Sequence, residues 1–325
     1  MTHGLRVAST PHFARMLSCK YAEMSGVRRV LLDLEQNHGR RLSLGVVQDV
    51  ADAVATVALV KEEAWAYEPG DLPAPVAAVS LGVDGTCALL VEDGWREVML
   101  GTVALYDRDG ARLHTTYLAA SPEHGKASFC EAFRREAGRA AAAFPKATRV
   151  GLADGAASNG SLLGELTDVQ TLDFYHVSEY LTRAADVAFA GEPAARQAWL
   201  DDACHRLKHE HDYAALLLAD LRGFRDRRVS RTARTTLEAS ITYVENHAHQ
   251  MTYADNIAKN LPLGSGVTEA ACKVIVKERI GIAGARWSER GATTVLTLRC
   301  LTYPDGRWKQ FWQKINRYGL VSYLM

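Results

Sequence analysis

The central part of the chain carries short apolar runs separated by turn-forming residues, the pattern of β-strands. The first run, Val76–Val83, stops at Asp84, and Gly85-Thr86 is expected to form a turn after it. Further on, an alanine-rich amphipathic stretch and a shorter one predict helices between the later strands. The predicted strands are 76–83, 87–91, 98–106, 113–118, 148–153 and 169–175, and the predicted helices are 121–144 and 161–166.

Without the short run 87–91, this order is β-β-β-α-β-α-β, which predicts an α/β protein with a mixed sheet of the ribonuclease-H-like kind. Turn residues at 92–94 and 107–110 favour antiparallel hairpins first, and the helices then allow parallel crossovers. In that fold the first and fourth strands are parallel neighbours, and open α/β sheets bind ligands at the ends of such strands. Asp84 and Asp154 follow these two strands, so we expect both at one edge of the sheet.

Helical segments flank this sheet and interrupt it. Residues 1–75 predict a helical N-terminal region with a linker at 67–75, and its helix at 42–66 is preceded by the basic turn 37–41. A DNA-binding helix-turn-helix arm and a plain helical bundle are both compatible with this pattern. After the first part of the core (76–176), residues 177–261 predict a helical insertion. Residues 262–325 predict C-terminal core helices at 267–280, 289–302 and 307–318 with a basic tail.

Composition narrows the class of protein. With 325 residues and 48% hydrophobic residues, the chain can bury a substantial core. The six cysteines are scattered without a Cys-x-x-Cys pair, which favours a reducing cytoplasm over disulfides or a zinc ribbon. We expect no membrane association, because no apolar run is long enough to span a bilayer.

The formal net charge is zero, but positive charge is concentrated locally. Residues 1–45 carry seven Lys and Arg against three Asp and Glu, and residues 273–317 carry ten against three. Aromatic residues are interleaved with the second basic region, a pattern that favours nucleic acid over a merely solvated helix face. The candidate DNA contacts are Lys273, Lys277, Arg279, Arg286 and Trp287, although a buried aromatic is the simpler role for the tryptophan.

Three carboxylates carry the candidate chemistry. Phosphoryl transfer by two metal ions needs several carboxylate oxygens, and Mg²⁺ prefers such oxygen ligands. Asp84 and Asp154 would hold the ions, Glu269 would complete the site, and Gly85 and Gly155 would let a phosphate backbone approach. Each residue also has a local alternative: Asp-Gly is a common turn, and Glu269 stands in the first turn of a predicted helix capped by Ser265, four residues before Lys273.

Six runs in the core and the C-terminal region give the chain a family resemblance: LGVDGTC (81–87), GLADGA (151–156), LDFYHVSEYL (172–181), YVENHAHQMTYAD (243–255), LPLGSGVTEAACKVIVKERIGIAGARWSERGA (261–292) and GRWKQFW (306–312). The chain resembles the DDE transposases of bacterial insertion sequences, of the ISKra group, from TPHFARMLSCKYA (10–22) to its end. The resemblance implies a catalytic triad of Asp84, Asp154 and Glu269 with Mg²⁺, for which Mn²⁺ substitutes. It also implies action on terminal inverted repeats of double-stranded DNA, a homodimer, association with the nucleoid and no nucleotide cofactor. His176 would lie beside the site or pack in the core.

Two departures keep a second function open. Relatives tend to carry an aromatic residue where this chain has Ser158-Asn159-Gly160, and to begin earlier with a further DNA-recognition segment. A catalytically silent DNA-binding derivative that regulates the element is therefore the alternative. A sugar-kinase-like phosphotransferase is disfavoured, because the chain lacks a second glycine-rich phosphate loop.

Overall fold

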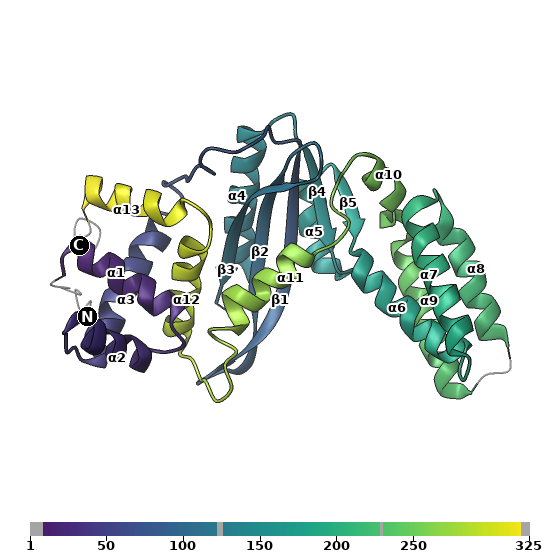
Figure 1. The fold of residues 1–325 in the computed structure, drawn as a ribbon, viewed down its shortest axis with the longest axis horizontal. Coiled ribbons are helices and arrows are strands. Elements are labelled where there is room, and N and C mark those ends of the chain that lie inside the picture. The colour runs from purple at the N-terminus through teal and green to yellow at the C-terminus, as the bar shows by residue number, and fades with distance from the viewer. Residues whose placement is uncertain (1–8, 122–125, 228–229, 320–325) are drawn as a thin grey trace.

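A five-stranded mixed sheet forms the centre of the protein, in the order β3-β2-β1-β4-β5 (Figure 1). The computed structural model describes residues 9–121, 126–227 and 230–319. Strand β1 (Ala78–Leu90) pairs antiparallel with β2 (Gly94–Tyr106) and parallel with β4 (Thr148–Ala153). Strand β3 (Arg112–Ala120) lies beyond β2, and β5 (Val169–Leu172) runs parallel to β4. The predicted α/β class with a mixed sheet is confirmed.

Strand β1 is longer than predicted, and the expected turn at 84–86 is wrong. Asp84 pairs with Leu100 and the pairing with β2 continues to Leu90, so the chain stays extended through the Asp-Gly pair. The antiparallel ladder supplies backbone hydrogen bonds that outweigh the local turn preference. The parallel pairing with β4, however, stops at Gly82. Asp84 therefore lies just past the end of the β1–β4 pairing, although it lies inside a strand.

Strand β5 is shorter than predicted. It ends at Leu172, and helix α6 (Phe174–Ala188) begins two residues later. The Asp173 side chain accepts a hydrogen bond from the Tyr175 backbone N–H at 2.6 Å, which satisfies one of the free donors at the helix start. The predicted strand 169–175 thus ends where an aspartate caps a helix.

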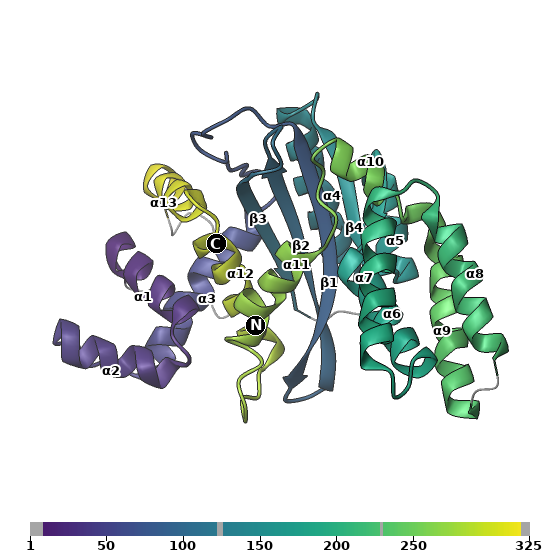
Figure 2. The same cartoon turned by 45° about the vertical axis from the view of Figure 1, so that its right-hand side comes forward.

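Helices cover both faces of the sheet. Helices α4 (Ala127–Ala143) and α5 (Ala157–Leu166) bury Phe129, Phe133 and Leu163 against one face. On the other face, α11 (Gly266–Ala271) crosses β1 and β2 (Figure 2). A side chain at Gly82 would place a Cβ 2.0 Å from Thr268 Oγ1, so this close crossing requires glycine there.

The two ends of the chain form one helical body beside the sheet (Figure 1). Its members are α1 (Pro11–Glu23), α2 (Val27–His38), α3 (Leu44–Val60), α12 (Glu289–Thr302) and α13 (Arg307–Tyr318). Ser43 caps α3 and Ser288 caps α12, each by accepting a backbone N–H three residues on. The predictions of α12 and α13 are confirmed at their observed bounds.

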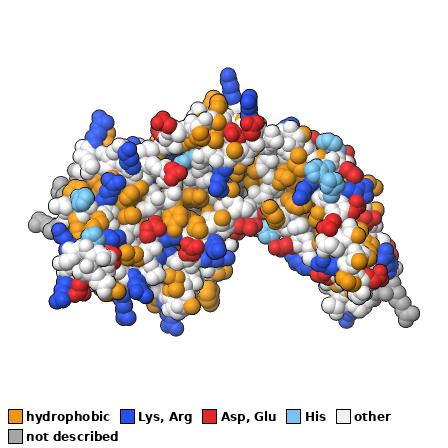
Figure 3. Space-filling view, in the orientation of Figure 1, with side chains coloured by type: hydrophobic (Ala, Val, Ile, Leu, Met, Phe, Trp, Pro, Cys, Tyr) orange, Lys and Arg blue, Asp and Glu red, His pale blue; other side chains and the backbone are white. Residues whose placement is uncertain are grey.

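The predicted insertion is helical and has its own apolar core. It continues from α6 through α7 (Pro193–His209), α8 (Tyr213–Asp226), α9 (Arg231–His247), the short η2 (Ala248–Gln250) and α10 (Tyr253–Ala258). Between this insertion and the sheet the surface is hollowed on its underside, with acidic and histidine side chains at the top of the hollow (Figure 3). Helix α6 begins and α11 passes in this region (Figure 1). None of the helices in the described ranges is long and apolar enough to cross a membrane.

Candidate metal centre at the sheet edge

Asp84 is held by one backbone and one side-chain donor. Its Oδ1 accepts the Gly85 N–H at 2.7 Å, and its Oδ2 accepts the Cys272 thiol at 3.2 Å. Burial, together with the nearby Asp84 charge, raises the pKa of the Cys272 thiol, which therefore remains a neutral donor. Cys272 follows Glu269 by three residues, so this contact joins Asp84 to the helix that carries Glu269. Cys272 is the first residue of η3 (Cys272–Lys277), a π-helical continuation of α11.

Asp154 is held mainly through its backbone. Its Oδ1 accepts the Ala156 N–H at 2.9 Å, while its carbonyl accepts the Tyr243 hydroxyl at 3.0 Å. One helical turn further along α9, His247 Nε2 lies 3.2 Å from the Gly155 carbonyl. No short-range pattern in the sequence points to Tyr243 or His247, because the loop that they contact lies about ninety residues away.

The two predicted glycines each have a packing reason to be glycine. A Cβ at Gly85 would lie 2.2 Å from Glu97 Oε1, so the room beside this residue is filled by a side chain of β2. Gly155 has φ +97°, a conformation that other residues rarely adopt, and a Cβ there would lie 3.0 Å from His247. These contacts give both glycines a structural role, and the idea that they also let phosphate approach stays a prediction.

Asp173 is a functional candidate that the sequence reasoning missed. It is fully buried, and besides capping α6 it accepts hydrogen bonds from the Ser265 N–H at 2.8 Å and from the Ser265 hydroxyl. Ser265 stands at the predicted N-cap position of the helix of Glu269, but its side chain makes no capping bond and turns to Asp173 instead. Asp173 directly follows β5, as Asp154 follows β4, and this position could have identified it. The sequence pattern, however, predicts a strand that continues to residue 175.

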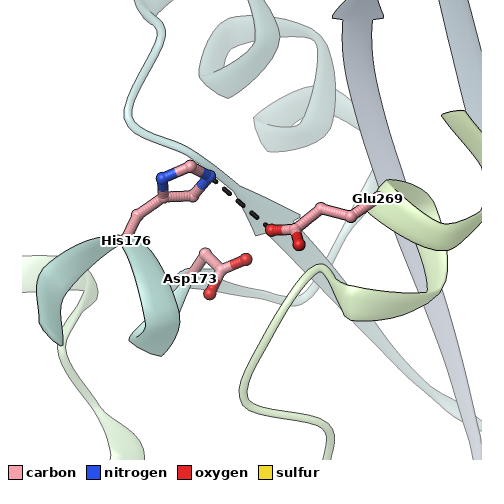
Figure 4. Close-up of side chains that lie close together, drawn as sticks. All are labelled: Asp173, His176 and Glu269. Carbon is pink, nitrogen blue, oxygen red and sulfur yellow. Dashed lines mark ion pairs between the residues drawn. The ribbon is translucent and has the colours of Figure 1, made fainter. Parts of the chain in front are cut away.

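Glu269 faces Asp173 and His176 (Figure 4). Its Oε1 lies 3.1 Å from Ser265 Oγ and 3.7 Å from His176 Nε2. One ligand atom from each of Asp173, His176 and Glu269 lies within 4.8 Å of the other two. The prediction that His176 adjoins the site agrees with this geometry. Within the described ranges, the alternative ion pair between Glu269 and Lys273 is not formed.

The three predicted carboxylates do not form one compact cluster. Among the described residues, no set of three metal-binding side chains within 4.8 Å includes Asp84 or Asp154. All three nevertheless suit a cation, because none forms an ion pair with a described Lys or Arg and each is at least partly accessible. Carboxylate oxygens of this kind are the donors that Mg²⁺ and Mn²⁺ bind.

The candidate DNA contacts divide into exposed and internal residues. Lys273, Lys277 and Arg286 are exposed. Arg279 is buried, burial lowers its pKa to about 10, and its guanidinium lies 4.6 Å from the Trp287 ring centroid. Trp287 is half-buried and donates its indole N–H to the Ile280 carbonyl at 3.2 Å. The prediction that Arg279 contacts DNA is therefore wrong, and the contacts of Trp287 support the structural alternative.

No model of a known protein family matches the chain, and no curated protein matches it.

Proposed function

We propose that this protein is a metal-dependent DNA strand-cleaving and strand-transferring enzyme of the DDE transposase type, built on a ribonuclease-H-like core. The strand order 3-2-1-4-5, with only β2 antiparallel to its neighbours β1 and β3, supports that core. The observation that carries the proposal is the position of Asp84 and Asp154 just past the last pairs of two parallel neighbouring strands. The Cys272–Asp84 bond adds the helix of Glu269 to this edge.

In the proposed reaction, Asp84, Asp154 and Glu269 bind the cations. Bound Mg²⁺ or Mn²⁺ would activate the attacking water or 3′-hydroxyl and stabilise the leaving oxygen. The protein holds the carboxylates in place through Cys272, Tyr243 and Ser265. Exposed Lys273, Lys277 and Arg286 supply positive charge for the phosphate backbone.

The hollow beside the sheet gives duplex DNA a place to approach (Figure 3). Acidic and histidine side chains lie at its top, where a cation would offset their repulsion of phosphate. A homodimer would bring two DNA ends together, as expected for this class of enzyme.

The test is a cleavage assay on end-labelled DNA fragments that flank the coding region on either side, with Mg²⁺ or Mn²⁺. We expect metal-dependent nicks at defined positions, and their loss in Asp84→Asn, Asp154→Asn and Glu269→Gln. Asp186→Asn is the matched control, because Asp186 is a carboxylate of the insertion that pairs with Arg196 at 2.5 Å. Cleavage that survives Glu269→Gln would contradict the proposal. Specific binding of the fragments without cleavage would instead support the silent regulator.

A further inference from the structure

The spacing between His176 and Glu269 is unusual for two groups in direct contact. His176 Nε2 and Glu269 Oε1 are 3.7 Å apart, which exceeds the roughly 3.2 Å limit of an N–H···O hydrogen bond. Two ligands of one ion, each about 2.1 Å from it, are at most about 4.2 Å apart. An ion between these two atoms would thus contact both without a large movement of either side chain.

Asp173 provides a second, independent reason to place a cation here. It is fully buried. Among the described residues, its carboxylate accepts hydrogen bonds only from the neutral donors Tyr175 and Ser265, and no Lys or Arg pairs with it. An ionised carboxylate removed from water is costly unless positive charge compensates it. A cation held by His176 and Glu269 would supply that charge within the group of three (Figure 4).

The surrounding contacts position the two residues that carry the ligand atoms. His176 stands in the first turn of α6, three residues after Asp173, whose side chain caps this helix. The Ser265 hydroxyl lies between the two carboxylates, 3.1 Å from Glu269 Oε1, and has one proton, which either Glu269 or Asp173 can accept. A metal ligand supported by such outer hydrogen bonds needs little reorganisation when the ion binds.

We propose that the metal ion bound by Glu269 has His176 Nε2 as a nitrogen ligand, with Asp173 as the compensating carboxylate. A catalytic role for this ion rests on the proposed function, whereas the binding of the ion to His176 and Glu269 does not. Imidazole suits transition metals, whereas Mg²⁺ prefers oxygen ligands alone. This centre therefore binds Mn²⁺ more tightly than Mg²⁺, whereas the carboxylates alone predict Mg²⁺ as the bound ion.

The test is pulsed electron paramagnetic resonance of the full-length protein loaded with one equivalent of Mn²⁺. A coordinated imidazole produces a nitrogen coupling, which we expect in the wild type and not in His176→Gln. The dissociation constant for Mn²⁺, measured by titration, should rise roughly ten-fold in this variant, with a smaller change for Mg²⁺. His176 is partly exposed, with 37% of its side chain accessible, so the variant is expected to fold.

Two further variants make the result specific. The double variant His205→Gln/His209→Gln removes a histidine pair on α7 whose ring centroids are 4.6 Å apart, and it should keep the nitrogen coupling. Glu269→Gln retains His176 but should also weaken Mn²⁺ binding. Absence of the coupling in Mn²⁺-loaded wild type, or its persistence in His176→Gln, would overturn the inference. A nitrogen coupling without DNA cleavage would support the inference and count against the proposed enzyme. DNA cleavage without a nitrogen coupling would support the proposed enzyme and overturn the inference.

Discussion

The Tyr243 hydroxyl donates a hydrogen bond to the backbone carbonyl of Asp154 at 3.0 Å, from a helix 89 residues further along the chain. Its ring stacks on Tyr180 with centroids 3.9 Å apart, and burial raises its pKa, so the hydroxyl remains protonated and able to donate. Helix α9 of the insertion thereby sets the backbone at one of the predicted metal-binding carboxylates. This contact gives the insertion a structural purpose at the site.

Replacement of Tyr243 by Phe tests this purpose. Loss of one partly buried hydrogen bond should lower the free energy of unfolding by about 1 kcal/mol, measured by urea denaturation. Metal-dependent cleavage should fall as well, because the loop of Asp154 is held less firmly. Tyr180→Phe is the control: it keeps the stacked ring and removes a hydroxyl that lacks a hydrogen bond within the described chain. Equal effects of both substitutions would argue against a special role for the Tyr243 hydroxyl.

The cysteines should differ sharply in their reactivity. Cys87 is exposed, whereas Cys272 and Cys300 are buried, and burial raises the pKa of Cys300 to about 12 and that of Cys272 likewise upward. Only the thiolate reacts, so iodoacetamide at about pH 8 should label Cys87 well before these two. Mass spectrometry of digested samples over time measures the order. Labelling of Cys272 as early as Cys87 would mean that the Cys272–Asp84 contact opens readily.

His114 should make stability depend on pH. Burial lowers its pKa from 6.5, with the Arg307 charge acting in the same direction and Asp305 opposing both. Below pH 6.5 the unfolded chain then binds more protons than the folded one, so the free energy of unfolding should fall as the pH is lowered.

His114→Gln should weaken this dependence. Urea midpoints at about pH 7.5 and about pH 5 are the measurement, and the difference between them should be smaller in the variant than in the wild type. His205→Gln, on the exposed side of α7, should leave the difference unchanged. If the difference between the two urea midpoints is the same in His114→Gln as in the wild type, other groups cause the loss of stability at low pH.

Arg299 joins the N-terminal helices to the C-terminal region. It is 2% exposed and donates to the carbonyls of Ala22, at 2.6 Å, and Val274. Arg299→Lys should lower the free energy of unfolding by about 3 kcal/mol, because an ammonium cannot reproduce the planar fork of donors. Arg290 is exposed and pairs with Asp52, and Arg290→Lys keeps the positive charge, so this control should cost about 0.5 kcal/mol or less. Denaturation curves of the two variants decide the matter, and similar losses in both would contradict this assignment.

The sequence predicts the local elements well where periodicity and end signals agree. The stretch 148–153 and helices α12 and α13 have their predicted bounds, since apolar spacing and terminal residues point to the same ends. The predictions at 84–86 and 169–175 were wrong for two different reasons. A turn-forming Asp-Gly pair was held in a strand by the ladder to β2, and an apolar run was cut short by a capping aspartate.

The sequence by itself determined the α/β class, the helical insertion and a set of candidate carboxylates, because these follow from patterns within a few residues. Only the tertiary structure decided which side chains surround Glu269. Asp173 reaches Ser265 across 92 residues, and Cys272 reaches Asp84 across 188. Such contacts depend on how separate elements pack on the sheet, and local periodicity carries no information about that packing.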